Sequence, residues 1–414
     1  MSQDFLTVPD AKARIQDQLS VIEGTRTVAI REALGQVLAQ EVLSPINVPA
    51  NDNSAMDGYA LRGDDIKAEQ PTRLQCVGTA FAGKMYEGLI EPGQCVRIMT
   101  GAVMPRGGDT VVIQENVQVE GDQLTFEPKA VTAGENRRLA GEDLTAGKTA
   151  LPAGKVLRPA DLGLLASLGV AEVVVKRKLR VAFFSTGDEL RSLGQPLDEG
   201  CVYDSNRYTI YGMLQRLGFV DVIDMGVVRD SKEALEQAML QAMSQADAII
   251  TSGGVSVGEA DYTKEVMEKL GAVNFWKIAM RPGRPMAFGH IHHPNQKSGA
   301  FLFGLPGNPV AVMVTFYSFV RDALLKLAGA HAMPLPMVSA RLAQDVRKRP
   351  GRTEYQRARL QMNDGILTAH LTGAQGSGIL RSMSESDCLL VLEHDQGSSK
   401  AGDVVMALPF EGLI

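Results

Sequence analysis

The sequence predicts a multidomain protein of the α/β plus β class, and three observations support this prediction. Between residues 180 and 327, apolar strands alternate with helices, which is typical of a mostly parallel sheet covered by helices on both faces. From residue 50 to about 145, and again after residue 336, short alternating runs are separated by glycine turns, which indicates two β-domains. A length of 414 residues leaves room for two to four domains at about 100–200 residues each.

The first 45 residues are expected to be largely helical. Apolar side chains recur at the spacing of one helical face at Ala11, Ile15, Leu19 and Ile22. A short extended piece over 27–30 leads into a second predicted helix over 32–40. Pro45 and Pro49 then break the pattern.

The next hundred residues predict strands, followed by one helix. Strands are expected over 73–77, 96–99 and 110–114, with glycine-rich turns between them. A helix is expected to begin with Pro159 in its first turn and to stop at Gly169, since proline is favoured at helix starts and glycine just past helix ends.

The α/β region follows from about residue 180. Strands are predicted over 181–184, 222–225, 248–250, 274–278, 286–289 and 301–304. Helices are predicted from an Asn206 N-cap to Leu217, over 232–244, from about 255 to 270, and from Val310 onward. Pro334 and Pro336 mark a linker to the last β-domain.

Composition argues against several classes of protein. Lys and Arg number 42 against 48 Asp and Glu, a net charge of −6, whereas proteins that bind nucleic acid or anionic membranes normally carry a basic excess. The longest apolar stretch, 310–320, is far shorter than the roughly 20 residues of a membrane span. The N-terminus lacks a signal sequence, and four scattered cysteines form no C-x-x-C pair. We therefore expect a cytoplasmic protein with reduced thiols.

Three loops of unusual composition follow predicted strands of the α/β region. They cover residues 185–189, 252–258 and 304–309, and in open α/β sheets ligands bind beyond the carboxyl ends of the strands. The glycine-rich second loop, which includes Ser252, Gly253 and Gly254, offers backbone N–H groups that suit a phosphate. The third loop, with Pro306, is a rigid turn before a helix.

Charged residues nearby allow two interpretations each. Asp261 either begins a helix or orients Mg²⁺ beside a phosphate. Lys277, Arg281 and Arg284 are either a solvated cluster or an anion clamp, and the Pro-Gly pair between the two arginines favours the clamp. The histidines at 290, 292 and 293 lack ligand spacing for structural zinc. P-loop, dinucleotide-fold and nucleophile-elbow motifs are absent from the sequence.

Polar clusters also occur in the first β region, at 52–60, 99–102 and 135–143. Together with 185–190, 204–206, 252–263, 281–285 and 304–309, they resemble, in order, the motifs of the MoeA/gephyrin E-domain family of molybdopterin molybdenumtransferases. The resemblance runs from about residue 5 to 410. It implies insertion of molybdate into adenylylated molybdopterin with release of AMP, the final step of molybdenum cofactor biosynthesis.

The resemblance also implies an elongated homodimer whose protomer has four domains. These are a molybdopterin-binding three-layer α/β domain (1–22 and 178–330), a connector (23–44 and 146–177), an inserted β-domain (45–145) and a C-terminal β-barrel (331–414). The active site is expected between the α/β domain of one subunit and the inserted domain of the other. An upstream adenylyltransferase is an expected partner.

The family pattern assigns the site residues. On the inserted domain it implies Asp57, Thr100, Arg138 and Asp143, and on the α/β domain it implies Glu189, Asp230, Asp261, Lys277 and Arg281. Asp57, Asp143, Glu189 and Asp261 would be catalytic, with Glu189 and Asp261 also holding Mg²⁺. The second loop would bind pyrophosphate and pterin, with Pro306 in the third loop, and Lys277, Arg281 and Arg284 would bind the terminal anions.

One departure and two alternatives remain. Relatives often carry Lys-Pro-Gly-Lys where this chain has Arg281-Pro-Gly-Arg284, and a guanidinium binds anions with a geometry that an ammonium lacks. A gephyrin-like scaffold is the main alternative, but it need not keep the acidic residues. A nucleotide pyrophosphatase, similar to competence-damage-inducible proteins, would lack the 52–60 cluster.

Overall fold

The computed structural model describes residues 5–254, 262–293 and 299–410, which form two compact units. Unit 1 comprises Met1–Ala39, Gly154–Pro159 and Glu172–Ile414. Unit 2 comprises Gln40–Ala153 and Ala160–Ala171. The chain therefore leaves unit 1 after Ala39, and Gly154 N, where it returns, donates to Leu38 O at 2.7 Å.

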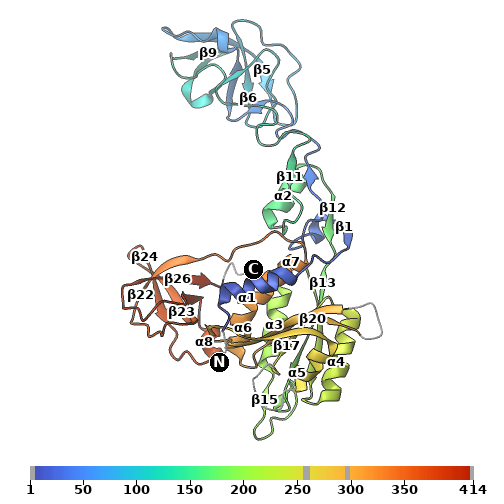
Figure 1. Cartoon of the computed structure of the whole chain (residues 1–414). Coiled ribbons are helices and arrows are strands. Elements are labelled where there is room, and N and C mark those ends of the chain that lie inside the picture. The colour runs from blue at the N-terminus through green and yellow to red at the C-terminus, as the bar shows by residue number, and fades with distance from the viewer. Residues whose placement is uncertain (1–4, 255–261, 294–298, 411–414) are drawn as a thin grey trace. The chain divides into compact units, whose positions relative to one another are not determined.

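The large sheet of unit 1 has the strand order β16-β13-β17-β21-β20-β18 (Figure 1). Its strands are β13 (Leu179–Thr186), β16 (Val220–Val228), β17 (Ala248–Ser252), β18 (Gly271–Lys277), β20 (Pro285–His292) and β21 (Gly299–Leu305). The first four strands in that order pair in parallel, whereas β20 is antiparallel to both β21 and β18. The prediction of a mostly parallel sheet is confirmed.

Helices cover both faces of this sheet. One apolar core joins it to α1 (Val8–Gln18), α3 (Ser205–Gln215), α6 (Pro309–Thr315) and α7 (Arg321–Leu327), and the other joins it to α4 (Lys232–Gln245) and α5 (Tyr262–Leu270). Val181 and Phe183 of β13 enter the first core, while Ala182 and Phe184 enter the second. Because successive strand residues face opposite sides, an uninterrupted apolar run is what a three-layer domain requires.

The helix predicted from Val310 contains one wide turn. A π-helical segment, Phe316–Val320, joins α6 to α7, and all five of its residues are buried. The helical stretch therefore runs from Pro309 to Leu327 without leaving the core.

The C-terminal part of unit 1 is a closed barrel. Its strands are β22 (Val338–Leu342), β23 (Thr353–Asn363), β24 (Ile366–Leu371), β25 (Cys388–Leu392) and β26 (Val404–Pro409). The order β23-β24-β22-β26-β25 closes because β25 also pairs with β23. The short strand β19 (Met280–Arg281) pairs in parallel with β23 and thereby joins the barrel to the α/β domain. The predicted barrel is confirmed.

The prediction of a helix over 32–40 is wrong. After β1 (Thr25–Ala29), which pairs with β12 (Glu172–Lys176), there is only a 3₁₀ turn at Ile30–Glu32. Gly35 then adopts a φ of +73°, which ends any helix. Val37 and Leu38 are buried and form bridges with Val156 and Val175, so β-type pairing replaces the helical pattern.

Unit 2 is built on a six-stranded sheet of order β7-β4-β6-β5-β9-β8. Its strands are β4 (Gly58–Leu61), β5 (Thr72–Ala80), β6 (Gln94–Ile98), β7 (Thr110–Ile113), β8 (Gln118–Glu120) and β9 (Gln123–Phe126). Two short ladders accompany it: β2 (Val42–Leu43) with β11 (Thr149–Leu151), and β3 (Asn53–Ser54) with β10 (Arg137–Arg138). The three predicted strands correspond to β5, β6 and β7, and the predicted helix after Pro159 is α2 (Pro159–Ser167).

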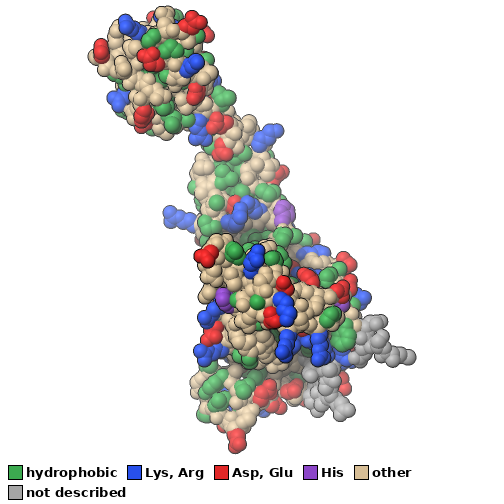
Figure 2. Space-filling view, turned by 90° about the vertical axis from the view of Figure 1, so that its left-hand side faces the viewer, with side chains coloured by type: hydrophobic (Ala, Val, Ile, Leu, Met, Phe, Trp, Pro, Cys, Tyr) green, Lys and Arg blue, Asp and Glu red, His purple; other side chains and the backbone are tan. Residues whose placement is uncertain are grey.

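Surface charge is mixed. Figure 2 shows basic and acidic side chains interspersed on the visible face, as the net charge of −6 leads one to expect. Cys95 and Cys388 are buried, Cys76 and Cys201 are half-buried, and all four thiols are free. Among the described residues, no helix has both the length and the apolar character to cross a membrane.

Candidate functional site

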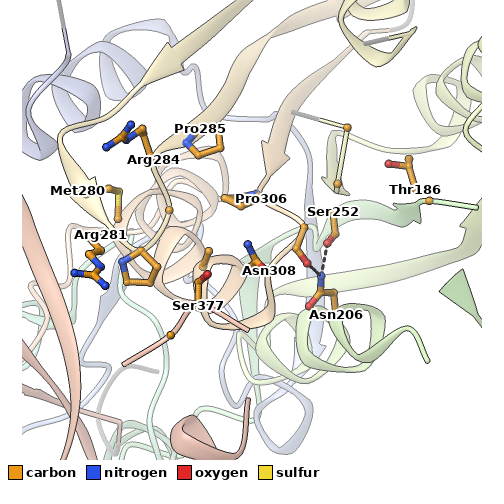
Figure 3. A pocket seen from close by; sticks show the side chains of 18 of the residues that line it. Thr186, Asn206, Ser252, Met280, Arg281, Arg284, Pro285, Pro306, Asn308 and Ser377 are labelled. Atoms are coloured by element: carbon orange, nitrogen blue, oxygen red, sulfur yellow. Dashed lines mark hydrogen bonds between the residues drawn. The ribbon is translucent and has the colours of Figure 1, made fainter. Parts of the chain in front are cut away.

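A pocket of about 710 Å³ lies in unit 1 at the carboxyl ends of β13, β17 and β21. All three loops singled out from the sequence contribute to its lining: Thr186, Gly187 and Glu189 from the first, Ser252, Gly253 and Gly254 from the second, and Pro306, Gly307 and Asn308 from the third. Figure 3 shows Thr186, Ser252 and Pro306 around this space. The parallel sheet brings the loops together because its strands end at one edge.

Gly253 allows the first two loops to approach closely. Its φ is +94°, and a Cβ at this position would lie 2.7 Å from the Thr186 carbonyl oxygen. A side chain would therefore meet backbone, which cannot move aside without shifting β13. Two features therefore require glycine at position 253: its positive φ, and the short distance between its backbone and that of Thr186 at the end of β13.

Asn206 ties the second and third loops to α3. Its side-chain Nδ2 donates to Ser252 Oγ at 2.8 Å and to the Gly307 carbonyl at 2.6 Å (Figure 3). The expectation that Asn206 caps α3 is wrong: the N-cap is Asp204, whose Oδ1 accepts from Arg207 N at 3.1 Å and from Ser185 Oγ at 3.1 Å. Asn206 is the second residue of the helix, and from there its amide reaches the second and third loops.

Two arginines enter the pocket from the segment between β18 and β20. Arg281 and Arg284 flank Pro282 and Gly283, and all four residues line the pocket. Gly283 has a φ of +96°, and a Cβ there would lie 2.5 Å from Thr315 Oγ1 of α6. The tight turn is therefore packed against α6. This contact fixes the backbone positions from which the Arg281 and Arg284 side chains extend.

The barrel contributes a third arginine and a loop. Arg352 Nε and Nη2 each lie 2.8 Å from Glu354 Oε1, and the Glu354 side chain is only 3% exposed. Gln375, Gly376 and Ser377 complete the lining on this side. The pocket is thus a joint product of the α/β domain and the barrel.

Carboxylates gather at the opposite side of the pocket. Glu189 and Asp230 line it, and Asp230 N donates to Asp188 Oδ1 at 3.3 Å. Burial, followed by the charges of Asp188 and Glu189, raises the pKa of Asp230 above its usual value. Mutually repelling carboxylates beside an anion pocket suit a hard divalent cation.

Among the described residues, the carboxylates at this side of the pocket could supply only one or two of the ligands of a Mg²⁺ ion. Within residues 5–254, 262–293 and 299–410, no group of three His, Cys, Asp or Glu side chains is arranged to hold a metal ion. Mg²⁺ commonly uses one or two carboxylates and takes its remaining ligands from water and phosphate. Asp261, the other expected ligand, lies outside the described residues.

In unit 2, the structure brings two of the expected residues together. Asp57 Oδ1 accepts hydrogen bonds from Thr100 N and Thr100 Oγ1, both at 2.7 Å. These two bonds, the backbone one first, lower the pKa of Asp57 below its usual value. Asp57 is therefore a well-held carboxylate at the start of β4, opposite the end of β6.

The other two expected residues of unit 2 have different partners. Arg138 Nε donates to Glu142 Oε1 at 2.7 Å, and Asp143 N donates to the Val48 carbonyl at 3.0 Å. Within the described residues, neither Arg138 nor Asp143 hydrogen-bonds or ion-pairs with Asp57.

Lys277 does not line the pocket. It lies at the end of β18, paired with Pro285. Thr186 and Asn308 lie in loops that the sequence indicated but were not named as site residues, and Asn206, Arg352, Gln375, Gly376 and Ser377 are further lining residues. Asn206 belongs to a motif that the sequence did indicate, whereas the barrel residues follow a linker and gave no sign of facing this sheet edge.

An α/β domain with glycine-containing loops at one sheet edge, an inserted β-unit and a C-terminal barrel together define a multidomain α/β plus β protein whose pocket suits an anionic ligand. Three family descriptions match the chain: "MoeA N-terminal region (domain I and II)" over residues 6–169, "probable molybdopterin binding domain" over 182–326, and "MoeA C-terminal region (domain IV)" over 339–410. The chain belongs to the MoeA family.

Individual relatives agree along the whole chain. A molybdopterin molybdenumtransferase of Haemophilus influenzae is 42% identical over 99% of this chain and 100% of its own length. One from Nostoc is 38% identical over 93% and 89%, respectively. A crystal structure of a molybdopterin biosynthesis MoeA protein from Pyrococcus horikoshii matches with a TM-score of 0.81 at 28% identity, covering 98% of this chain and 100% of that one.

Proposed function

We propose that this chain is a molybdopterin molybdenumtransferase, which inserts molybdate into adenylylated molybdopterin and releases AMP. One observation carries the proposal: a single pocket combines glycine loops, two arginines on a fixed turn and a group of carboxylates. Such a pocket suits an anionic, phosphate-bearing ligand together with a divalent cation. Membership of the MoeA family supports an enzyme of molybdenum cofactor biosynthesis.

The lining residues suggest how the substrate is held. Ser252, Gly253 and Gly254 would bind the pyrophosphate and pterin through hydroxyl and backbone N–H groups, with Pro306 forming the neighbouring wall. Arg281 and Arg284 would bind the terminal anions. Lys277 is not among the described lining residues, so we assign the clamp to the two arginines.

The reaction needs positioning and charge stabilisation rather than a covalent enzyme intermediate. An oxygen of molybdate attacks the pterin phosphorus, and the bond from this phosphorus to the AMP phosphate breaks, so that AMP leaves. The two dithiolene thiols then replace oxygen on molybdenum, and their protons leave with an oxygen atom as water. Glu189 and Asp261 would hold Mg²⁺, which when bound neutralises charge that develops on the phosphates. The negative charge of Asp230, beside Asp188 and Glu189, would help this side of the pocket to attract a cation.

We further infer a homodimer with a shared active site. The carboxylate of Asp57, held by Thr100, belongs to a different compact unit from the pocket, and Arg138 and Asp143 belong to that same unit 2. In a dimer, Asp57 of the partner subunit would complete the pocket. Light scattering tests this, because a monomer at micromolar concentration would contradict a shared site. An upstream adenylyltransferase would supply the substrate.

The decisive experiment follows AMP. Purified protein is incubated with adenylylated molybdopterin and Mg²⁺, with and without molybdate. Release of AMP that requires molybdate supports the transferase, and release that is independent of molybdate would instead indicate a pyrophosphatase. No release would favour the alternative of a gephyrin-like scaffold. Asp261→Ala is expected to bind the pterin substrate but to lose turnover.

A further inference from the structure

Arg357 places a buried charge on the outer face of the C-terminal barrel, since its neighbour Ala358 belongs to the barrel core and its cross-strand partner Leu389 to the core shared with the α/β domain. It lies on β23 and is 0% exposed. Its guanidinium donates to four neutral acceptors: Nε to Ser382 Oγ at 3.0 Å, Nη1 to Gln375 O at 3.2 Å, and Nη2 to Ala374 O at 3.2 Å and Gly376 O at 2.9 Å. Among the described residues, no carboxylate forms an ion pair with it.

Stability alone does not account for this arrangement. Burying a charge without a counter-charge costs folding free energy. Replacing a buried charged side chain by an apolar one of similar size often leaves the stability of the fold unchanged or increases it. Burial, with a smaller effect from the charge of Arg281, lowers the pKa of Arg357 to about 10. The side chain therefore stays charged at neutral pH, and the field of a pocket-lining arginine reaches it.

Three of the four acceptors of Arg357 belong to one loop, and Gln375 and Gly376 of this loop line the pocket. The carbonyls of three consecutive residues, Ala374, Gln375 and Gly376, all point toward the guanidinium. In a planar trans peptide the N–H points opposite to the C=O, so the N–H groups of residues 375–377 point away from Arg357. None of these three N–H groups donates a hydrogen bond within the part of the chain that the structure describes.

The backbone of Arg357 holds the same loop. Arg357 N donates to Gln375 Oε1 at 2.8 Å, and Gln375 Nε2 donates back to Arg357 O at 3.1 Å. On the far side, Ser377 O accepts from Val310 N at the start of α6. The loop is therefore fixed between β23 and the helix, with Ser377 beside Asn308 at the pocket (Figure 3).

We propose that Arg357 is a positioning residue, which binds the carbonyls behind the loop and thereby turns the N–H groups of residues 375–377 toward the pocket as a cradle for an oxyanion. Successive N–H groups that face one concavity bind anions, and the buried guanidinium polarises the peptide units that carry them. The ligand is a tetrahedral oxyanion, either molybdate or a phosphate group. This inference rests on the proposed function and adds a residue that does not itself touch the ligand.

The test compares the full-length protein with three variants. Arg357→Met removes the charge and all the guanidinium N–H donors but keeps a side chain of similar length. Arg357→Lys keeps the charge but replaces the planar guanidinium with a single ammonium group. Arg359→Met is the matched control: Arg359 is exposed, lies two residues further along β23, and donates to the Glu385 carbonyl away from the pocket. Titration calorimetry with molybdate and, separately, with AMP measures affinity, and amide hydrogen exchange of residues 373–378 measures the loop.

We expect molybdate or AMP to protect the amides of residues 375–377 in the wild type, and the ligand that does so identifies the oxyanion. Arg357→Met should weaken that binding by about tenfold or more and speed exchange in this loop, while Arg359→Met leaves both unchanged. Unchanged affinity in Arg357→Met, or wild-type amides that neither ligand protects, would overturn the proposal. If Arg357→Met does not fold, Arg357→Lys decides by the same two measurements. Molybdate-independent AMP release would reject the transferase without affecting this result.

Discussion

The side-chain amide of Asn206 bridges Ser252 Oγ and the Gly307 carbonyl, and so joins the ends of β17 and β21 to α3. All three residues line the same pocket. The relative positions of two ligand-binding loops thus depend on one buried amide. This makes Asn206 as much a part of the site as the charged residues around it.

Replacing this amide should loosen both loops. We expect Asn206→Ala to lower the free energy of unfolding by about 1–3 kcal/mol, because the buried Ser252 hydroxyl and the Gly307 carbonyl lose their donor, and to weaken pterin binding. Chemical denaturation and ligand titration measure the two effects. Gln215→Ala, an exposed change on the same helix, should stay within about 0.5 kcal/mol of the wild type. Equal effects of the two changes would contradict the role given to Asn206.

Two glycine substitutions can separate the cost of a positive φ from the cost of a steric clash at Gly253. Gly253→Ala must accept a positive φ and also places a methyl group 2.7 Å from the Thr186 carbonyl. Gly194→Ala meets the same kind of φ, +87°, with no atom within 4 Å. We expect about 1–2 kcal/mol of destabilisation from the conformation in both variants. A further loss of about 1–3 kcal/mol, and loss of ligand binding, should occur only in Gly253→Ala. Equal denaturation midpoints for Gly253→Ala and Gly194→Ala would show that the short distance between position 253 and the Thr186 carbonyl does not affect stability.

Thr100 should control the titration of Asp57. Thr100→Val removes the hydroxyl but keeps the backbone N–H, so the pKa of Asp57 should rise part of the way toward its usual value, and Thr100→Ser should leave it low. A depressed carboxyl pKa favours the folded state above the unfolded value of about 3.9, and this benefit is lost as pH falls through the folded pKa. Carboxyl NMR titration of Asp57 measures it. An unmoved titration in Thr100→Val would show that the hydroxyl has no part.

Asp247 should be a major stabilising carboxylate of unit 1. Burial alone would raise the pKa of Asp247, but hydrogen bonds from Arg177 at 2.7 and 2.9 Å and from Arg180 outweigh this and keep the pKa low. We expect Asp247→Asn to cost about 3 kcal/mol at pH 7. The difference should shrink below about pH 4, as the wild-type carboxyl takes up its proton.

The matched control is Asp221→Asn, whose exposed carboxylate lies 3.8 Å from Lys178 Nζ. An ion pair of this kind is worth about 0–1 kcal/mol, so this variant should denature like the wild type. Urea unfolding at pH 7 and pH 3 tests both substitutions. A constant difference between wild type and Asp247→Asn across this range would contradict an ionised Asp247 as the source of stability.

Glu189 should set the requirement for Mg²⁺. Glu189→Gln removes one of the charges that raise the pKa of Asp230, so this pKa should fall toward its usual value, as NMR titration would reveal. We also expect the Mg²⁺ concentration for half-maximal AMP release to rise about tenfold. Glu199→Gln, on the same exposed segment, is the control. An unchanged Mg²⁺ midpoint would leave Glu189 without a role at the metal.

Much of the fold follows from the sequence because its signals are local. The apolar run of β13 supplies both cores of a three-layer domain, and the end-of-strand loops meet because parallel strands share an edge. The helix expected over 32–40 failed since its apolar spacing also suits buried bridges, and Gly35 decides between them. Asn206 is a good capping residue, yet Asp204, two positions earlier, takes the cap.

The rest of the site depends on contacts between distant segments. Arg352 and residues 375–377 reach the pocket because β19 pairs with β23, and this pairing joins Met280 to Thr353 across the linker. No periodicity or spacing in the sequence carries that information. Lys277 shows the converse: three cations within eight residues look equivalent in sequence, but Arg281 and Arg284 line the pocket that the described residues form, whereas Lys277 ends β18 opposite Pro285.

The π-helical segment at Phe316–Val320 has an evolutionary consequence. A π turn holds one more residue than an α turn, so the flanking helices keep the faces they would have in a chain one residue shorter. Deleting a single residue here should restore an ordinary α-helix without rotating α6 or α7. We therefore expect natural variation in chain length at this point to be neutral for the packing on either side, even though the segment lies in the core.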